Sequence, residues 1–439
     1  MTAAGREAAA TAALRIADAL ADPVEVARGL PADRRHTLCD GLAGTALLHA
    51  LLAGAVPGAA ARARAHWRLA AATLGNARPD GVYRGPGGLA ASLLAGAEQV
   101  SPAERPGDAA GDAVRGAVRW LSARAEVIAG RPWPGPAPGS ATCPWPVYDV
   151  MSGLSGTGRL LLAAYGADAA AEAAPGLMAA QSALTRMVLA GTPDRPGWWQ
   201  PAGRLPGPAP GHPDGAAVTG TAHGIAGPLA LLALAETTGP ATEGRRTAVR
   251  AAADWLVTVQ ENDSWPPRAT AAAPRPRPGP RPRPRPGTAP ATGPGTGVGS
   301  GRRDAWCYGA PGIARALALA STALGDPAYA RLADLALTAL AERPGTSWDT
   351  DGAGLCHGSA GVLVCALRAG HRSLAESAAR RTLCLASGPS PGTPGVPDAA
   401  GSELGLLGGA AGTALALAQY AGLLPPSSRV PWDCLLLTV

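Results

Sequence analysis

The sequence predicts an all-α protein built as a ring of helical hairpins, and two observations support that prediction. The pattern Gly-x-x-Gly recurs seven times along the 439 residues, and most copies open a short apolar run rich in alanine and leucine. Longer amphipathic runs, such as 63–74 and 245–259, lie between the copies. An inner and an outer ring of paired helices would produce this alternation of apolar and amphipathic helices.

The glycine pairs define the repeat. One Gly-x-x-Gly carries no information in a chain with 59 glycines, but seven copies, roughly 45 to 85 residues apart, indicate a repeat architecture. Valine, isoleucine and aromatic residues are sparse and strict alternation is absent, so strands have little support. We predict an α/α toroid of seven helical hairpins, one domain over residues 1–439, with an open helical solenoid as the alternative. The pairs are Gly41/Gly44, Gly85/Gly88, Gly153/Gly156, Gly224/Gly227, Gly309/Gly312, Gly358/Gly361 and Gly409/Gly412.

Composition excludes several function classes. The chain has no lysine, and all 38 of its basic residues are arginine. Schiff-base catalysis needs an amine side chain and a P-loop needs its lysine, so neither is possible. Residues 1–21 lack the apolar core of a signal peptide, and no apolar run is long enough to predict a membrane span. Seven cysteines, an odd number, then favour reduced thiols and a cytoplasmic location.

One segment departs from the repeat pattern. Residues 266–301 alternate proline with arginine and then become rich in glycine, threonine and proline, a composition that cannot form a core. This segment contains an arginine excess equal to the whole net charge of +6, so the rest of the chain is neutral and nucleic-acid binding is not expected. We interpret it as a disordered insertion within the domain. The alternative is a docking strip for an acidic peptide or an anionic membrane.

Reactive side chains precede four of the glycine pairs. Cys307 precedes one pair, and Cys356 and His357 precede the next. Two thiolates and an imidazole are ligands that Zn²⁺ prefers, and three ligands leave a fourth position open. His223 and Asp149 precede two further pairs, so equivalent repeats would bring all five side chains to one rim of the ring. A closed structural zinc site, or buried free cysteines, is the alternative.

These motifs together resemble the lanthionine synthetase C-like family, the cyclases that close thioether rings in lanthipeptides. The resemblance extends from about residue 40 to 417. It implies a seven-fold α/α toroid, one Zn²⁺ per chain held by Cys307, Cys356 and His357, and the stand-alone cyclase of a class I pathway. The matching motifs are Trp-Cys-Tyr-Gly-x-Pro-Gly at 306–312, Cys-His-Gly-x-Ala-Gly at 356–361, His-Gly-Ile-Ala-Gly at 223–227, and Asp149 ahead of Ser-Gly-Leu-Ser-Gly at 152–156.

The resemblance also implies a reaction and its participants. The substrate is a dehydrated precursor peptide with a leader, whose cysteine thiols add to dehydroalanine or dehydrobutyrine. His223 is then the general acid and a candidate base, and Asp149 orients it. Arg303 and Tyr308 match positions that steady the enolate or the substrate, although Arg303 could instead form a salt bridge with a neighbour such as Asp304. A dehydratase and an exporter are the implied partners, in a complex peripheral to the membrane.

Two other functions remain open at this point. Relatives in the same family resemble proteins that add glutathione to dehydroamino acids, which would keep the fold and the zinc but change the substrate. A binding protein could capture a peptide cysteine without turnover, but it would not need an acid–base pair. Cys39 and Asp40 share the register of the zinc ligands, and Cys143 lies near Asp149; we expect neither cysteine to ligate the metal.

Overall fold

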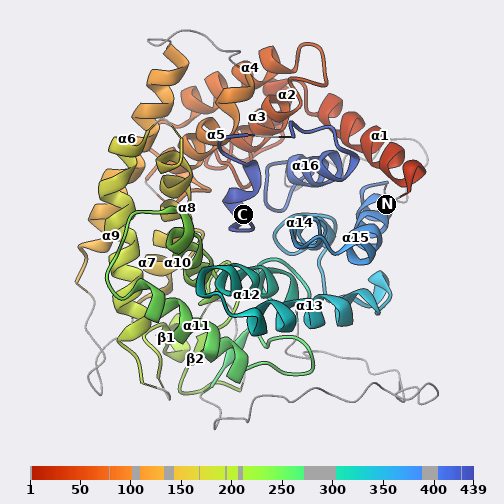
Figure 1. Cartoon of the computed structure of the whole chain (residues 1–439). Coiled ribbons are helices and arrows are strands. Elements are labelled where there is room, and N and C mark those ends of the chain that lie inside the picture. The colour runs from red at the N-terminus through yellow and green to blue at the C-terminus, as the bar shows by residue number, and fades with distance from the viewer. Residues whose placement is uncertain are drawn as a thin grey trace, which may run out of the picture.

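The computed structural model describes residues 2–78, 80–100, 109–132, 143–167, 169–192, 195–205, 211–270, 303–387, 404–426 and 428–439. These residues form two concentric rings of helices, seen end-on in Figure 1. Helix follows helix around the ring in chain order, and the last inner helix packs against the first. The predicted α/α toroid is therefore confirmed, and its closure excludes the open solenoid.

Each inner helix packs against an outer one. The inner helices are almost wholly buried because they contact both neighbours in the ring and an outer helix. Within the described residues the inner ring consists of α3 (Leu42–Leu51), α5 (Gly85–Val100), α8 (Leu154–Tyr165), α10 (Ala226–Thr238), α12 (Ala310–Leu324), α14 (Ser359–Ala369) and α16 (Ala410–Ala421). The outer ring consists of α4 (Ala59–Thr73), α6 (Ala109–Ala129), α9 (Ala170–Leu189), α11 (Arg245–Thr258), α13 (Pro327–Ala341), α15 (Arg372–Ser387) and α1 (Ala3–Ala19).

The seventh hairpin joins the two ends of the described chain. Helix α16 packs on α1, so the first helix in the sequence is the outer partner of the last inner helix. Short elements complete the fold: α2 (Pro23–Arg28), α7 (Trp145–Tyr148), and the 3₁₀ turns η1 (Ala202–Arg204), η2 (Gly345–Ser347) and η3 (Trp432–Leu436).

A closed belt of backbone hydrogen bonds joins the residues that precede the inner helices. We call these residues the rim segments. Each donates an amide to a carbonyl of the next, although the partners are far apart in sequence. The bonds run from Leu38 to Tyr83 (2.9 Å), Val82 to Met151 (3.2 Å), Val150 to Ala222 (3.0 Å), Thr221 to Cys307 (2.9 Å), Cys307 to Cys356 (3.2 Å), Cys356 to Leu407 (2.8 Å) and Leu406 to Leu38 (2.9 Å).

The belt explains the second glycine of each pair. This glycine lies in the first turn of an inner helix, directly against the rim segment. A Cβ atom at Gly361 would lie 2.0 Å from the carbonyl oxygen of Leu355, and one at Gly412 would lie 1.8 Å from that of Leu406. Real Cβ atoms do not approach so closely, so only glycine allows the helix to begin there.

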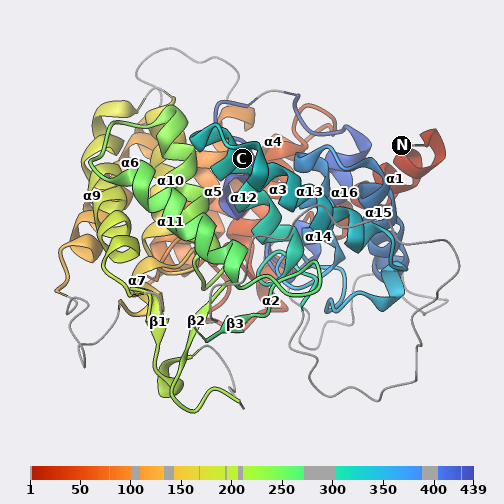
Figure 2. The same ribbon diagram turned by 60° about the horizontal axis from the view of Figure 1, so that its bottom comes forward.

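A small antiparallel sheet, which the sequence did not predict, lies beside the ring. Its strands are β1 (Trp199–Gln200), β2 (Ala216–Val218) and β3 (Arg268–Ala269), in that order (Figure 2). They are too short to produce a visible alternation. Strand β3 shows that the first residues of the segment 266–301 are packed, since the Thr219 hydroxyl donates to the carbonyl of Pro266 at 2.6 Å. Residues 271–302 lie outside the described chain, so the interpretation as a disordered insertion stays a prediction.

No helix among the described residues is both long enough and apolar enough to cross a lipid bilayer.

Candidate metal centre and acid–base pair

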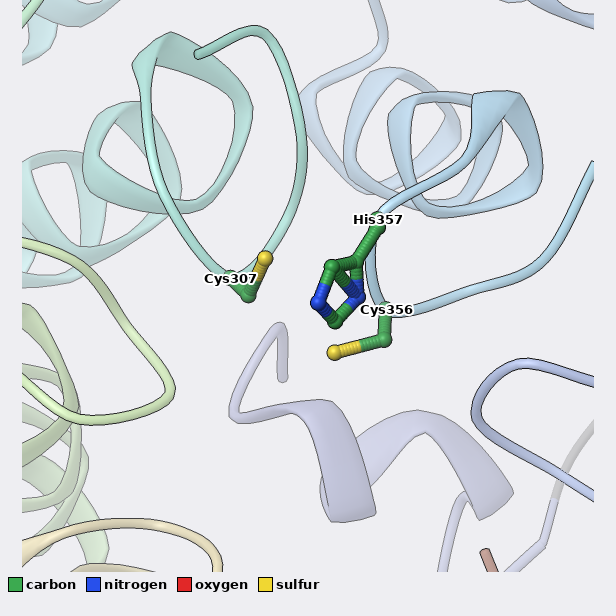
Figure 3. A group of neighbouring side chains, drawn as sticks. All are labelled: Cys307, Cys356 and His357. Atoms are coloured by element: carbon green, nitrogen blue, oxygen red, sulfur yellow. The ribbon is translucent and has the colours of Figure 1, made fainter. Parts of the chain in front are cut away.

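Cys307, Cys356 and His357 meet at the rim (Figure 3). Their ligand atoms all lie within 4.8 Å of one another; both cysteines are buried and the histidine is exposed. Ligands bound at about 2.0 to 2.3 Å to one tetrahedral ion lie roughly 3.3 to 3.8 Å apart. The three side chains therefore fit one Zn²⁺ after a small contraction. They form the one such cluster of three or more His, Cys, Asp or Glu side chains that we find within the described residues.

The belt holds the two ligand loops together. The Cys307 amide donates to the carbonyl of Cys356 at 3.2 Å, and the Asp351 amide donates to the carbonyl of His357 at 2.8 Å. Although the His357 side chain is exposed, desolvation of its ring by the surrounding groups, and then the nearby Arg303 guanidinium, lower its pKa. A lowered pKa favours the neutral imidazole, which is the form that binds a metal.

His223 and Asp149 form a hydrogen-bonded pair. The His223 Nδ1 lies 2.8 Å from Oδ2 of Asp149, whose side chain is fully buried. The other carboxylate oxygen accepts the amide of Ser152 at 2.8 Å. Burial raises the pKa of Asp149, and the hydrogen bond with His223 opposes that rise. A carboxylate acceptor at Nδ1 favours the tautomer of the imidazole that carries a proton on that nitrogen.

Two aromatic rings pack around His223. The Trp145 ring meets it edge-on with centroids 4.8 Å apart, and the Tyr308 ring lies 6.5 Å away at a tilt. Burial, and then the charge of Cys307, raise the pKa of Tyr308, so its phenol stays protonated. Tyr308 directly follows Cys307 in the chain and its ring packs near His223, so it connects the two candidate groups.

Sequence reasoning missed Trp145. Its signal was weak, because it lies in the Pro/Trp-rich stretch before Asp149 rather than in a rim motif. The fully buried Gln200 holds this stretch, since its amide nitrogen donates to the carbonyl of Cys143 at 2.8 Å and to that of Trp199 at 3.0 Å. Cys143 is buried there and lies outside the metal-ligand cluster.

Arg303 forms ion pairs with two aspartates of the loop that precedes His357. Its guanidinium lies 3.3 Å from Asp349 and also contacts Asp351. The ion pair considered from sequence therefore exists, but not with Asp304, which pairs with Arg343 at 2.7 Å. These contacts tie the loop before Cys307 to the loop before Cys356.

The position before the first glycine of each pair carries mostly polar side chains, as repeat equivalence predicts. The occupants are Asp40, Arg84, Ser152, His223, Tyr308, His357 and Gly408. Cys39, one residue earlier, donates to the Asp40 carboxylate at 3.2 Å, and burial raises the pKa of its thiol to about 12. It is not in the metal-ligand cluster.

Comparisons with known proteins agree with this geometry. A family model described as lanthionine synthetase C-like protein matches residues 32–436. Thirteen solved chains match the structure significantly, among them nisin cyclase, with a TM-score of 0.70, 96% of each chain covered and 18% sequence identity. That similarity shows a shared fold, and no curated protein sequence matches significantly. Since the family model spans nearly all of the ring and every residue of the rim, the chain belongs to the lanthionine synthetase C-like family.

Proposed function

We propose that the protein is a zinc-dependent lanthipeptide cyclase. It acts on a dehydrated precursor peptide and forms (methyl)lanthionine rings. The observation that supports this function best is the meeting, at one rim, of a three-ligand metal group with the His223–Asp149 pair. The fold shared with nisin cyclase is consistent with it.

Cys307, Cys356 and His357 would hold one Zn²⁺ and leave one coordination position for a substrate sulfur. When bound, the ion lowers the pKa of a substrate thiol, while its two thiolate ligands keep the sulfur electron-rich enough to attack. The ligand cysteines lie directly before the N-termini of α12 and α14. The positive ends of the helix dipoles favour thiolates there.

The protein side chains manage the proton. His223 takes the thiol proton on Nε2, the sulfur bonds to the β-carbon of the dehydroamino acid, and the alkene electron pair moves to the α-carbon. His223 then returns the proton to that carbon, so no proton is gained or lost overall. Asp149 stabilises the imidazolium in between. Tyr308, protonated beside the site, would donate a hydrogen bond to the enolate. Arg303 would hold the loop that carries His357 through its ion pair with Asp351, and its positive charge would favour the enolate.

A protein that only binds peptide cysteines fits less well. Asp149 is fully buried, and a buried carboxylate is costly unless a partner offsets its desolvation. A binder gains nothing from retaining such a pair beside its metal. A glutathione-adding enzyme would use the same rim, so we keep it as the second candidate. For the cyclase we propose cytoplasmic action with a dehydratase and an exporter as partners, peripheral to the membrane.

The test compares His223→Ala with Cys356→Ala. His223→Ala should keep the metal and slow ring formation by about 10² to 10⁴, the usual value of general acid–base assistance. Cys356→Ala should lose most of its metal, since it removes one of three protein ligands. Zinc is measured by elemental analysis, and rings by mass spectrometry of a dehydrated precursor after thiol alkylation. Asp149→Asn should slow turnover in the same direction as His223→Ala.

Full-rate ring formation by metal-replete His223→Ala would show that this histidine is structural. Full zinc occupancy in Cys356→Ala would remove the metal assignment. If wild-type protein ignores the precursor but couples glutathione to a dehydroalanine peptide, the second candidate replaces the first.

A further inference from the structure

Residues 430–439, which we call the lumen segment, lie inside the inner ring, where Figure 1 marks the C-terminus. It contains η3, and nearly all of its side chains are buried. The helices of the inner ring are rich in alanine, leucine and glycine, yet three of them turn an arginine toward this segment. These arginines are Arg159 of α8, Arg315 of α12 and Arg368 of α14.

The arginines bind the lumen segment through its polar groups. Arg368 forms a two-point ion pair with Asp433, whose side chain is fully buried, with one of the two contacts at 2.7 Å. Arg315 donates to the carbonyl of Thr438 at 2.8 Å, and Arg159 donates to the main-chain oxygen of Val439 at 2.7 Å. Because these three arginines make several hydrogen bonds to buried groups of the lumen segment, the segment has one defined position in the ring.

Two rim residues bind the same segment from the side of the metal ligands. The indole N–H of Trp306 donates to the carbonyl of Leu436 at 2.7 Å, and the hydroxyl of Tyr83 donates to that of Leu435 at 2.6 Å. Trp306 directly precedes Cys307. Its Cβ lies 3.0 Å from where a Cβ of Gly361 would be, so it also packs on the first turn of the helix that follows Cys356 and His357.

We propose that Trp306 is a positioning residue for the metal site, and that the lumen segment is the support to which it anchors the Cys307 loop. The inference rests on the proposed metal centre. Trp306 contacts both ligand-bearing repeats and is fixed at its far end by one buried hydrogen bond. Without that bond the indole and the backbone before Cys307 become more mobile. Binding of the metal must then order Cys307, and the lost conformational entropy weakens the affinity. Tyr83, whose hydroxyl donates to the neighbouring Leu435 carbonyl, gives the lumen segment a second anchor in the rim.

The chain offers a matched control. Trp265 is as buried as Trp306, with 1% and 0% of their surfaces exposed, and its indole N–H also donates to a carbonyl, that of Leu256, at 2.7 Å. It lies in the connection after α11, outside the rim segments. Trp306→Phe and Trp265→Phe therefore remove the same chemical group from equally buried places, and only one of these places adjoins the metal ligands.

The experiment measures Zn²⁺ affinity of the full chain by competition with a chromophoric chelator, together with the absorption spectrum of the Co²⁺ form. Loss of a supporting contact outside the ligand set typically weakens metal binding by about 10- to 100-fold, and we expect this for Trp306→Phe. Its Co²⁺ bands should also shift. Trp265→Phe should bind Zn²⁺ like the wild type, although both variants lose melting temperature.

The proposal would be overturned if Trp306→Phe bound Zn²⁺ with wild-type affinity, or if both tryptophan variants lost Zn²⁺ affinity to the same extent. If Trp306→Phe does not fold, Tyr83→Phe decides the matter, because it removes one oxygen atom. Its control is Tyr329→Phe, which removes a hydroxyl that donates to Asp254 at 2.7 Å in the outer ring. Weaker zinc binding by Tyr83→Phe alone supports the proposal, and equal affinities contradict it. If the wild-type protein does not bind zinc, the proposed zinc-dependent function is itself contradicted.

Discussion

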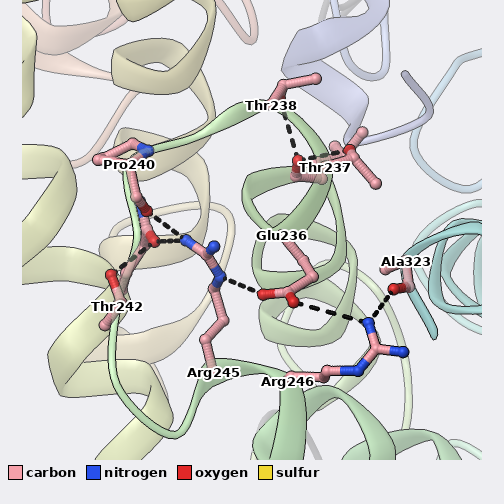
Figure 4. Close-up of polar contacts among 10 residues, drawn as sticks. Glu236, Thr237, Thr238, Pro240, Thr242, Arg245, Arg246 and Ala323 are labelled. Carbon is pink, nitrogen blue, oxygen red and sulfur yellow. Dashed lines mark hydrogen bonds and ion pairs between the residues drawn. The ribbon is translucent and has the colours of Figure 1, made fainter.

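The two ends of the inner helices are built differently. At the end where these helices begin, a backbone belt holds the rim segments, and the candidate site lies on it. At the opposite end, in the turns between α10 and α11 and between α12 and α13, charged side chains neutralise one another. Figure 4 shows one such turn, between α10 and α11: Glu236 lies 2.8 Å from Arg245 and 3.7 Å from Arg246. Arg246 also donates to the carbonyls of Ala323 and Leu324 at the end of α12.

The difference gives a physical reason why the candidate site lies at the end where the inner helices begin. Helix N-termini present unpaired amides and the positive end of the dipole, and therefore favour thiolates and a developing enolate. Helix C-termini present carbonyls, which Arg246 already satisfies at α12. The end of the ring where the inner helices begin is thus suited to bind anionic groups. The contacts at the opposite end stabilise the fold.

Substitution of glycine should show the largest difference in stability between the two ends of an inner helix. Helix α14 has a glycine at each end. At Gly361, in its first turn, a Cβ would lie 2.0 Å from the Leu355 carbonyl oxygen. At Gly370, just after its end, φ is +68° and nothing lies within 4 Å of a Cβ. Gly361→Ala should lower the free energy of unfolding by about 3 kcal/mol or more, because the backbone must shift. Gly370→Ala should cost only about 1 kcal/mol, the penalty of a left-handed conformation.

Urea denaturation of the two variants measures the difference, and Zn²⁺ content provides a second readout. Gly361→Ala should also bind zinc poorly, since its clash displaces the rim segment that carries Cys356. Equal costs for the two substitutions would mean that the rim tolerates movement and that the belt is not the rigid part of the ring.

The same contrast explains what the sequence could predict. The glycine pairs predicted the inner helices and the common rim because each pair is required by a local contact, in which the start of a helix packs against the segment just before it. The metal-ligand cluster and the His223–Asp149 pair followed from that shared register. The pairing of α1 with α16, the lumen segment and Trp145 could not be predicted. They depend on contacts between distant segments, such as Trp306 with Leu436, that leave no periodic signal.

The second prediction tests the far end alone. Glu236→Gln should reduce the free energy of unfolding by about 2 kcal/mol, because it leaves the buried Arg245 guanidinium without its carboxylate. The Glu236 side chain is 19% exposed and that of Arg245 is 6% exposed, so solvent screens the pair little. Zinc affinity and the rate of ring formation should stay at wild-type values, measured on the same samples. A fall in zinc affinity would show that the two ends are coupled.

The smallest effect concerns pH. In the first hairpin, His66 of α4 lies 2.7 Å from the hydroxyl of Thr45 in α3 and 3.3 Å from the Ala21 carbonyl, and it packs against His49. Burial, and then the charge of His49, lower the pKa of His66 to about 4, against an ordinary value near 6.5. The unfolded chain therefore binds the proton first as pH falls, so stability decreases from about pH 6.5 down to about pH 4.

Between pH 7 and pH 5.5 this single group should cost about 1 kcal/mol of unfolding free energy. His66→Gln retains a hydrogen-bonding side chain but cannot titrate, so its stability should fall less steeply over the same interval. Urea midpoints of both proteins across that interval measure the two slopes. Since His66 joins α4 to α3 and to the connection after α1, and contacts neither ligand loop, the loss should occur without release of zinc before unfolding. Parallel slopes in the two proteins would place the acid sensitivity elsewhere, and zinc release ahead of unfolding would place it at the rim.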